Sequence, residues 1–428
     1  MATAYLRRAR SVLSALSLVA LSACGAGAPS EVVVHPDAVS NVGGRATGGP
    51  SNLQTALASH DGPVRFVLSN GHYFLEPSEY EDPLCANCAD PTERVPATLG
   101  LRVSGRGIEL VGANADSVVI HTNAGYGLLF EECENCLLSG VTVTDGVRDP
   151  DGRASDAGIV VRASTVRIEE CRITENLGDS AVVASVVVGV MGIAGRENSD
   201  FSVNNCVIER NSWDGIALFR DARAEIRNNI VDGVDKASGS RVGGGRGVAI
   251  GITWNAEAIV EGNLVRRYWK GIGMFVDAHA TVRNNIVEDM LTWGIAYWGA
   301  DSGLAVATIE ENVVFQTGAC GVLIDRPTGG DEPAGSFSRN AIVRANQNER
   351  YDSGEPYCEQ LPIAHDRIPD GFVEADNLIH DNRRPDDAPE LLQLNEADFR
   401  EQAAPLVASL RERPALAVSY FLEEFGGR

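Results

Sequence analysis

Asp221-Ala-Arg-Ala-Glu-Ile-Arg-Asn-Asn229 belongs to the repeat that decides how this chain folds. The same nine-residue phrase returns as Asn255-Ala-Glu-Ala-Ile-Val-Glu-Gly-Asn263 and as Asp277-Ala-His-Ala-Thr-Val-Arg-Asn-Asn285. Looser copies end at Asn205, Asn312 and Asn340. Consecutive copies lie 22 to 34 residues apart. Periods of this length are typical of stacked units that cannot bury their own apolar faces alone.

A second phrase, in which a glycine precedes alternating apolar residues, accompanies the first. Its copies begin at Gly215, Gly247, Gly271, Gly294 and Gly321. Alternation with a period of two predicts short strands rather than helices. We therefore expect strands that wind into stacked parallel sheets, with asparagines at the corners hydrogen-bonding along the stack. Each aliphatic side chain buried between coils contributes roughly 1.5–3 kcal/mol.

The pattern Gly-Ile-x-x-x followed by Ile-x-Asn-Asn-x-Ile resembles the right-handed parallel β-helix repeat of the pectate-lyase-like superfamily. The resemblance extends over residues 100–345. It implies an all-β fold, a right-handed parallel β-helix (solenoid) with an N-terminal capping helix and a C-terminal irregular and helical tail. The superfamily includes lyases, glycosidases, uronan epimerases, phage tailspikes and non-catalytic surface proteins, so the resemblance by itself selects no function.

The amino terminus has the features of an export signal. Three arginines within the first ten residues precede an apolar run from Val12 to Leu21, which is short for a membrane span. Leu21-Ser-Ala-Cys24 resembles the bacterial lipobox, which implies cleavage before Cys24 and lipidation of its thiol. Glycine rather than aspartate follows, which by the same resemblance favours the outer membrane. The alternative is a plain secretory signal with an incidental cysteine.

The remaining chain reads as one long solenoid. We expect a signal peptide at residues 1–23, a tether at 24–50, the β-helix at 51–345, and a C-terminal loop and helical cap at 346–428. The C-terminal helix is either an end cap or a helix packed along the side. Ser51 is a candidate helix cap. The apolar run Ala181–Ile193 forms either a strand pair buried on both faces or a surface patch, and we expect the buried pair.

The charge balance bears on the partners. The chain carries 36 Lys and Arg against 59 Asp and Glu. An acidic surface discourages binding to nucleic acid, and no segment resembles a nucleic-acid module. We expect a monomer that contacts the membrane only through its lipid anchor.

Eight of the nine cysteines remain after Cys24. Cys85-Ala-Asn-Cys88 and Cys133-Glu-Asn-Cys136 are both CxxC pairs. They are open to three interpretations: local or crossed disulfides, free structural thiols, or zinc ligands. We favour disulfides or thiols, because no histidine neighbours either pair. Cys171 and Cys206 occupy the same slot of their coils and are expected to fill core space.

Aromatic and charged residues line one flank of the predicted solenoid. On successive coils the outward fifth position of the strand holds Phe219, Thr253, Phe275, Trp298 and Asp325. The position before each strand glycine holds Asp214, Arg246, Lys270, Trp293 and Cys320, and Trp213 and Trp269 precede two of these. Trp254 lies beside the same flank. All five tryptophans of the chain fall between residues 213 and 298.

This strip predicts a glycan-binding surface. Residues 210–283 contain eleven Lys and Arg against eight Asp and Glu, on an otherwise acidic chain. Rings stack on sugar faces and cations pair with carboxylates, so the strip suits an acidic polysaccharide. The expected contact residues are Trp213, Phe219, Trp254, Trp269, Phe275, Trp293, Trp298 and Asp325. The alternative is that these aromatics pack under a long loop, such as Asp232–Arg246.

The resemblance implies two kinds of chemistry at the strip. Uronan lyases of this fold use Lys or Arg to take the C5 proton, and the only lysines are Lys236 and Lys270. We therefore expect Lys270, Arg246 and Asp214 to be catalytic. Glycosidases need two carboxylates, but their paired-Asp and Gly-His-Gly motifs are absent, as is the Asp cluster that binds metal in pectate lyases. We expect no metal cofactor, because no motif in the sequence supports calcium binding.

The sequence thus predicts a surface-anchored lipoprotein that binds an acidic extracellular or cell-wall polysaccharide and processes it as a lyase or C5-epimerase. The alternative is a non-catalytic adhesin or structural scaffold.

Overall fold

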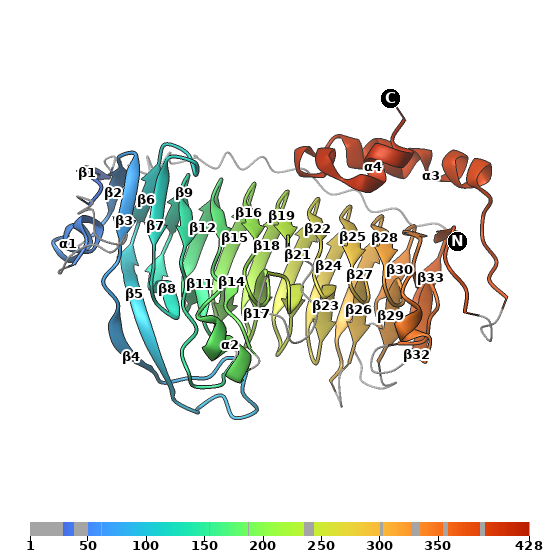
Figure 1. The fold of residues 1–428 in the computed structure, drawn as a ribbon, viewed down its shortest axis with the longest axis horizontal. Coiled ribbons are helices and arrows are strands. Elements are labelled where there is room, and N and C mark those ends of the chain that lie inside the picture. Colours follow the sequence, from blue (N-terminus) through green and yellow to red (C-terminus); the bar gives the residue numbers. More distant parts are fainter. Residues whose placement is uncertain are drawn as a thin grey trace, which may run out of the picture.

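Three long sheets run the length of the protein in a computed structural model, which describes residues 29–37, 50–60, 62–153, 155–186, 188–234, 244–299, 303–326, 334–353, 358–385 and 390–427. The chain is a right-handed parallel β-helix, as the repeat predicts (Figure 1). The expected signal peptide, Cys24 and most of the tether lie outside the described residues.

Sheet A is the face on which the nine-residue phrase forms a strand in every coil. Within the described residues it contains β1 (Ser30–Val34), β2 (Val64–Leu68), β6 (Ile108–Gly112), β9 (Cys136–Ser139), β12 (Thr165–Glu169), β15 (Asp200–Asn204), β18 (Arg223–Arg227), β21 (Glu257–Glu261), β24 (His279–Arg283), β27 (Val306–Glu310), β30 (Ser336–Ser338) and β33 (Val373–Ala375).

Sheet B follows sheet A in each coil after a sharp corner. Its described strands are β3 (Gly71–Phe74), β7 (Val118–His121), β10 (Thr142–Thr144), β13 (Arg172–Thr174), β16 (Val207–Glu209), β19 (Ile230–Asp232), β22 (Leu264–Arg266), β25 (Ile286–Met290), β28 (Val313–Thr317), β31 (Ala341–Val343) and β34 (Leu378–His380).

Sheet C holds the second phrase of the repeat. Its described strands are β4 (Ser78–Asp82), β5 (Val95–Arg106), β8 (Tyr126–Glu134), β11 (Ala157–Arg162), β14 (Met191–Arg196), β17 (Ile216–Leu218), β20 (Val248–Ile252), β23 (Lys270–Phe275), β26 (Ile295–Trp298), β29 (Val322–Asp325) and β32 (Ile363–Arg367). Only β4 pairs antiparallel, with the long strand β5.

The solenoid is longer than the boundaries at residues 51 and 345 allow. β1 already pairs with β2, and β32, β33 and β34 add a further coil beyond residue 345. The sequence of this last coil repeats only weakly. Its ladder asparagine is Asn377, which lies beyond the last repeat copy recognised in the sequence.

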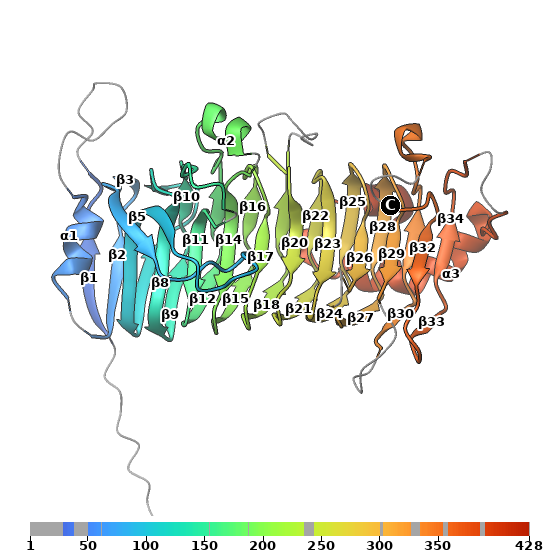
Figure 2. The same cartoon turned by 90° about the horizontal axis from the view of Figure 1, so that it is seen from below.

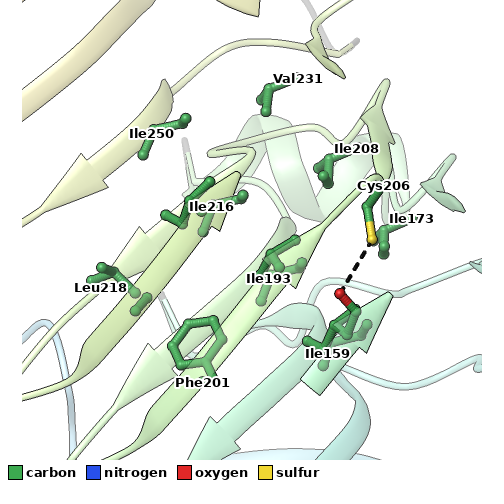
Figure 3. Packing of buried hydrophobic residues seen from close by; sticks show 14 of the residues in the cluster. Ile159, Ile173, Ile193, Phe201, Cys206, Ile208, Ile216, Leu218, Val231 and Ile250 are labelled. Atoms are coloured by element: carbon green, nitrogen blue, oxygen red, sulfur yellow. Dashed lines mark hydrogen bonds between the residues drawn. The ribbon is translucent and has the colours of Figure 1, made fainter. Parts of the chain in front are cut away.

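The interior is a continuous apolar core between the three sheets. Inward side chains of the same column stack from coil to coil: Figure 3 shows Ile159, Ile193, Ile216 and Ile250 from successive strands of sheet C, facing residues of sheet B. Each coil therefore supplies the wall that the next coil lacks, as expected for a solenoid.

The corner between sheets A and B contains the predicted asparagine ladder. Each ladder amide donates from Nδ2 to the Oδ1 of the next, through Asn229, Asn263, Asn285, Asn312, Asn340 and Asn377 at 2.9–3.1 Å. The slot on the preceding coil holds Cys206, whose backbone N–H donates to Asn229 Oδ1, so the inclusion of Asn205 was wrong by one residue. Asn205 instead adopts φ 54°, the left-handed turn conformation that precedes every slot.

Two groups of helices cover parts of the coil. Helix α1 (Asn52–Ala58) has Ser51 as its N-cap in a capping box, as predicted, and buries Leu53 at the first coil. Helices α3 (Glu396–Arg411) and α4 (Tyr420–Phe425) lie along the side of the solenoid over sheet B (Figure 1). They pack on outward apolar residues such as Phe315. The C-terminal tail is therefore a side cover rather than an end cap.

Three further short helices lie in the connections of the described chain. Two of them are 3-10 turns, η1 (Glu349–Tyr351) and η2 (Pro414–Val418). The apolar run 181–193 was expected to be a buried strand pair, but its first part forms α2 (Ser180–Val186), which projects from the coil (Figure 2). Only Val183 of α2 is buried, while the second part enters the fully buried strand β14. No helix within the described ranges has the length and apolar character of a membrane span.

Candidate functional site

The candidate site lies on the outer face of sheet C, where the strand columns follow the predicted alignment in most coils. Phe275, Trp298 and Asp325 are register partners on β23, β26 and β29, so three residues far apart in sequence form one column. The second predicted column needs one correction. Ile216 pairs with Ile250 and Val248 pairs with Lys270, so Val248 rather than Arg246 stands between Asp214 and Lys270.

Arg246 is displaced because its coil carries two extra residues before the strand. Its side chain is only 2% exposed, and burial lowers the pKa of its guanidinium. The prediction that Arg246 faces a substrate therefore does not agree with its position inside the corner. Aligning the phrase on Gly247 produced this error, since the residue that matches Gly215 is Ala249.

Asp214 is held at the corner by the next coil. Its Oδ1 accepts the backbone N–H of Val248 at 2.6 Å. A side chain at position 247 would clash, because a Cβ there would lie 2.0 Å from the same oxygen, which explains the glycine. Burial raises the pKa of Asp214 to about 7, although the hydrogen bond from Val248 and the charge of Lys270 oppose the shift. A carboxyl group in this state can hold a proton near neutrality.

Lys270 lies two coils from Asp214, which corresponds to about 9–10 Å between strands. The side chain is half-buried, and its Nζ lies 4.9 Å from the centre of the Trp269 ring. Burial lowers the pKa of the amine, and Asp214 opposes this shift. A lowered pKa increases the neutral fraction of the amine, which is the form that can accept a proton.

A column of small residues forms the floor of the face between these groups. It runs through Ala217, Gly251, Gly273 and Ala296, which are register partners on four successive strands. A Cβ at Gly251 would meet only Val248, at 3.8 Å, so there is room for a methyl group on this buried glycine. The ring of Phe275 instead folds over Gly273, where a Cβ would lie 2.2 Å from the ring. The floor therefore has room for a side-chain atom at Gly251 but is covered by an aromatic ring at Gly273.

The later aromatics form a cluster beside this floor. Phe275 lies edge-to-face with Trp293 at 6.2 Å and with Trp298 at 6.0 Å between ring centres. Trp293 is 3% exposed and packs with the Cys320–Cys358 disulfide, whereas Trp298 is 36% exposed. Of this group, Trp298 thus has the most surface available for a ligand.

Asp325 closes the column that begins with Phe275 and Trp298. Its carboxylate accepts a 2.6 Å hydrogen bond from Nε of Arg367 on β32 and is 5% exposed. The predicted role in substrate binding is therefore opposed by an internal ion pair.

The earlier aromatics are covered by a segment from the start of the chain. We call residues 80–95, which run across sheet C from β4, the N-terminal roof. Phe219 is buried beneath it, and Trp213 and Trp254 pack at the edge of the same cluster. Trp254 Nε1 donates to Asn87 at 3.3 Å, and Arg220 stacks on the Trp254 ring at 4.1 Å. These three aromatic residues thus pack under a covering segment, as the alternative to glycan binding states, although the segment is residues 80–95.

The roof is fastened by a buried charge network. Asp82 is fully buried; it accepts hydrogen bonds from Arg162 and Arg196, and from the hydroxyl of Tyr126 at 2.7 Å. Arg220 adds bonds to the carbonyl oxygens of the disulfide loop. The predicted cover, Asp232–Arg246, cannot be compared, since residues 235–243 lie outside the described part of the chain.

The predicted cationic strip does not form, because its charges are spread over all three sheets. Arg223 and Arg227 lie on sheet A, where Arg223 pairs with Glu257 at 3.3 Å beside a shallow hollow of about 430 Å³. Arg266 and Arg267 both pair with Asp232 on sheet B. Sequence spacing located the excess of charge but not the face on which each side chain projects.

The cysteines follow two of the three interpretations. Cys85 and Cys88 form a local disulfide, while Cys133 and Cys136 are free and buried. Cys171 and Cys206 are core residues in one slot, as predicted. Among the described residues no group of three or more His, Cys, Asp and Glu side chains is arranged to hold a metal.

Sequence reasoning missed two features of the site. The small outward column was visible as Ala217, Gly273 and Ala296 at the third position of three strand phrases, but its role as a floor was not recognised. Tyr268 belongs to neither predicted column, and its side chain lies in the apolar core behind the corner rather than on the outer face. Its hydroxyl is buried without a hydrogen-bond partner among the described residues, and the charge of Asp214 raises its pKa further than burial alone.

Comparisons with known proteins agree with the fold. Residues 100–245 match the family model described as right handed beta helix region. A search of curated proteins found no match.

Solved structures with the same topology share little sequence with this chain. PfbA, a surface adhesin of Streptococcus pneumoniae, is 11% identical with a TM-score of 0.49, over 77% of this chain and 86% of that one. A mannuronic acid specific family 6 polysaccharide lyase from human gut microbiota is 11% identical with a TM-score of 0.46, over 92% and 98%. The A-module of an Azotobacter vinelandii mannuronan C-5 epimerase is 14% identical with a TM-score of 0.36, over 80% and 92%. At these identities the likeness concerns the fold alone.

Proposed function

We propose that this protein binds an acidic polysaccharide across the outer face of sheet C and acts on it as a lyase or C5-epimerase. The observation that carries the proposal is the outward row of small residues through Gly251 and Gly273, which has Lys270 and Asp214 at one end of the strands and Phe275 and Trp298 at the other. Strand β23 has six residues, so these ends are about 16 Å apart.

Lys270 is the proposed base. A neutral amine takes the C5 proton of a uronate residue, and the electron pair is delocalised into the adjacent carboxyl group. Elimination of the O4 substituent then produces an unsaturated sugar, whereas return of a proton to the opposite face produces the epimer. Asp214, whose pKa is raised to about 7, is the proposed proton donor. A positioned base typically contributes about 10²–10⁴-fold to the rate.

The proposed test is the formation of unsaturated product from alginate, pectate and glycosaminoglycans, together with exchange of the C5 hydrogen with solvent. We expect Lys270→Ala to lower turnover at least 100-fold, in line with the loss of a general base of about 10²–10⁴-fold. Lys236→Ala is the matched control, since it removes the other lysine of the chain. Equal turnover of the wild type and Lys270→Ala would remove Lys270 from the mechanism.

A non-catalytic adhesin or structural scaffold is the second candidate. It is favoured by the burial of Phe219, Trp293 and Arg246, which leaves few of the predicted contact residues open to a ligand. On this proposal Trp298→Ala and Trp269→Ala weaken glycan binding, and neither product nor hydrogen exchange is detected at any pH. A glycan array coupled to product analysis distinguishes the two candidates.

We also propose export and anchoring in the outer membrane through a lipid on Cys24. The support is the signal-like sequence at residues 1–23. Cys24→Ala is expected to move the protein from the membrane fraction to the soluble exported fraction; an unchanged distribution would contradict lipid anchoring.

A further inference from the structure

Two histidines and one aspartate form a chain of contacts on the outer face of sheet B, away from the candidate site. His72 lies on β3 and His121 on β7, and Asp145 directly follows β10. His72 Nδ1 lies 2.8 Å from His121 Nε2, and His121 Nδ1 lies 2.6 Å from Asp145 Oδ2. Helices α3 and α4 pack on later strands of this sheet and do not reach these coils.

Asp145 determines the tautomer of His121. A carboxylate can only accept a hydrogen bond, so in the neutral imidazole Nδ1 carries the proton and Nε2 keeps a free lone pair. Phe74 stacks on the His121 ring at 4.4 Å between centres and fixes its plane. A basic nitrogen is thus held in a set position beside His72.

The spacing of the two nitrogens matches adjacent positions around a metal ion. With bonds of about 2.0–2.1 Å, two ligand nitrogens at a right angle lie about 2.8–3.0 Å apart, whereas tetrahedral coordination requires about 3.3 Å. The observed 2.8 Å is a hydrogen-bond distance, and it places both nitrogens within reach of one ion. Two imidazoles with water in the remaining positions suit the tetragonal geometry that Cu²⁺ and Ni²⁺ prefer. His72 is exposed and can rotate its ring to aim Nδ1 at such an ion.

We propose that His72 and His121 bind a divalent transition metal ion of the imidazole-preferring class, Cu²⁺ or Ni²⁺ ahead of Zn²⁺, with water in the remaining positions. Metal binding replaces the hydrogen bond between the rings. The proton on His72 Nδ1 moves through solvent to His72 Nε2, so both rings stay neutral and no proton is released. Asp145 is a positioning residue that acts through His121 rather than a ligand, an arrangement common around metal-bound histidines.

The experiment is a calorimetric titration of the full exported chain, purified without a polyhistidine tag, with NiCl₂, CuCl₂ and ZnCl₂ separately. We expect one ion per chain, with Cu²⁺ and Ni²⁺ bound more tightly than Zn²⁺. His72→Gln and His121→Gln each weaken binding at least tenfold. Asp145→Asn weakens it about 10–100-fold, as loss of a partner of a metal ligand typically does. Visible spectra of the Cu²⁺ complex provide a readout independent of heat.

His279→Gln is the matched control, because His279 is an exposed histidine on sheet A. Thermal unfolding of each metal-free variant tests whether the coil is intact, and only folded variants are compared. The proposal is overturned if none of the three metals binds, or if the His72 and His121 variants bind as tightly as His279→Gln. It is equally overturned if binding persists in both but is lost when Cys133 and Cys136 are replaced by serine.

Discussion

The corner between sheets A and B and the corner between sheets B and C differ in how much they vary. From β9 onward the first corner has two residues in every coil, for example 228–229 and 284–285, and the first of the two adopts positive φ. The second corner ranges from three residues (267–269) to nineteen (344–362). Asp214, Trp213, Trp269 and Trp293 all belong to the variable corner or its border.

The difference between the two corners shows where the solenoid tolerates insertions and substitutions. A buried asparagine in the first corner bonds to the coils on both sides, so a change in one coil affects its neighbours. Insertions at the second corner point outward and leave the stack intact. Residues that carry chemistry are therefore expected at the variable corner, while the constant corner holds the fold. The following predictions test this division, beginning with the largest effect.

Replacing a ladder asparagine should cost the most stability. Asn285 Nδ2 donates to Val260 O and to Asn312 Oδ1, and Asn285 Oδ1 accepts two hydrogen bonds from Asn263. Asn285→Leu leaves these buried groups without partners, which costs about 1–3 kcal/mol each, so we expect a loss of about 4 kcal/mol in total. Chemical unfolding measures the loss.

Asn255→Asp is the control for the ladder variant, since Asn255 is exposed and aspartate tolerates its φ of 61°. We expect a change within about 0.5 kcal/mol. Equal effects of the two substitutions would show that the ladder does not stabilise the constant corner more than an ordinary exposed turn.

Asp214 should make stability depend on pH. Its pKa rises from 3.8 to about 7 on folding, so the folded state favours the protonated form. The resulting stabilisation is complete below pH 3.8 and is lost as the pH rises through 7. Asp214→Asn keeps an acceptor for Val248 N–H and should remove roughly 4 kcal/mol of this pH dependence, at about 1.36 kcal/mol per pKa unit.

Unfolding by denaturant at several pH values between 4 and 8 checks the Asp214 prediction. Asp221→Asn, at an exposed position, is the control. An identical slope for the wild type and Asp214→Asn would mean that Asp214 is not shielded from solvent and that the variable corner lacks a perturbed acid.

A large side chain at Gly251 should separate binding from stability. Gly251→Phe places a ring where glycan contact is proposed, and we expect at least tenfold weaker binding, which corresponds to about 1.4 kcal/mol. Gly251→Ala should bind like the wild type, because its Cβ meets only Val248 at 3.8 Å. Affinity electrophoresis in alginate or pectate measures both. Undiminished binding by Gly251→Phe would place the ligand elsewhere.

The smallest effect is expected where the ladder gives way to cysteine. Cys206 occupies a ladder slot, and its sulfur accepts the N–H of Cys171 at 3.4 Å. Cys206→Asn would extend the asparagine ladder by one coil, so we expect stability to change by less than about 1 kcal/mol. Thermal unfolding is sufficient, and a loss of several kcal/mol would show that the slot there is shaped for sulfur.

The sequence predicts what repeats and fails where the chain departs from its period. The columns through Phe275, Trp298 and Asp325 were predictable, because strand alternation and coil stacking together determine them. Arg246 was misplaced because its coil has two extra residues, so Val248 rather than Arg246 is the register partner of Lys270. An insertion leaves no mark in the alternation itself, so only the register of the hydrogen bonds reveals it.

The repeat pattern could not predict which distant segments cover the outer face of sheet C. Nothing local indicates that Asn87 would meet Trp254 across 167 residues, or that Asp82 would pair with Arg196 across 114. Burial of the apolar run at 181–193 was expected from hydropathy, yet α2 exposes most of its residues. Charge excess likewise indicates a region of sequence and not a face of the molecule.

The two covers of the solenoid have a consequence for how it melts. A stack of coils bound only to their neighbours can fray from its ends, because each end coil has a single interface. Here the N-terminal roof spans the coils from β5 to Trp254, and the C-terminal helices span those from Ile230 to Leu378. The two spans overlap at the coil that contains Ile230 and Trp254, so no interface in the described coils from β5 to β34 lies beyond both. Terminal coils are thereby coupled to the middle of the rod, and denaturation should proceed as one cooperative event rather than coil by coil.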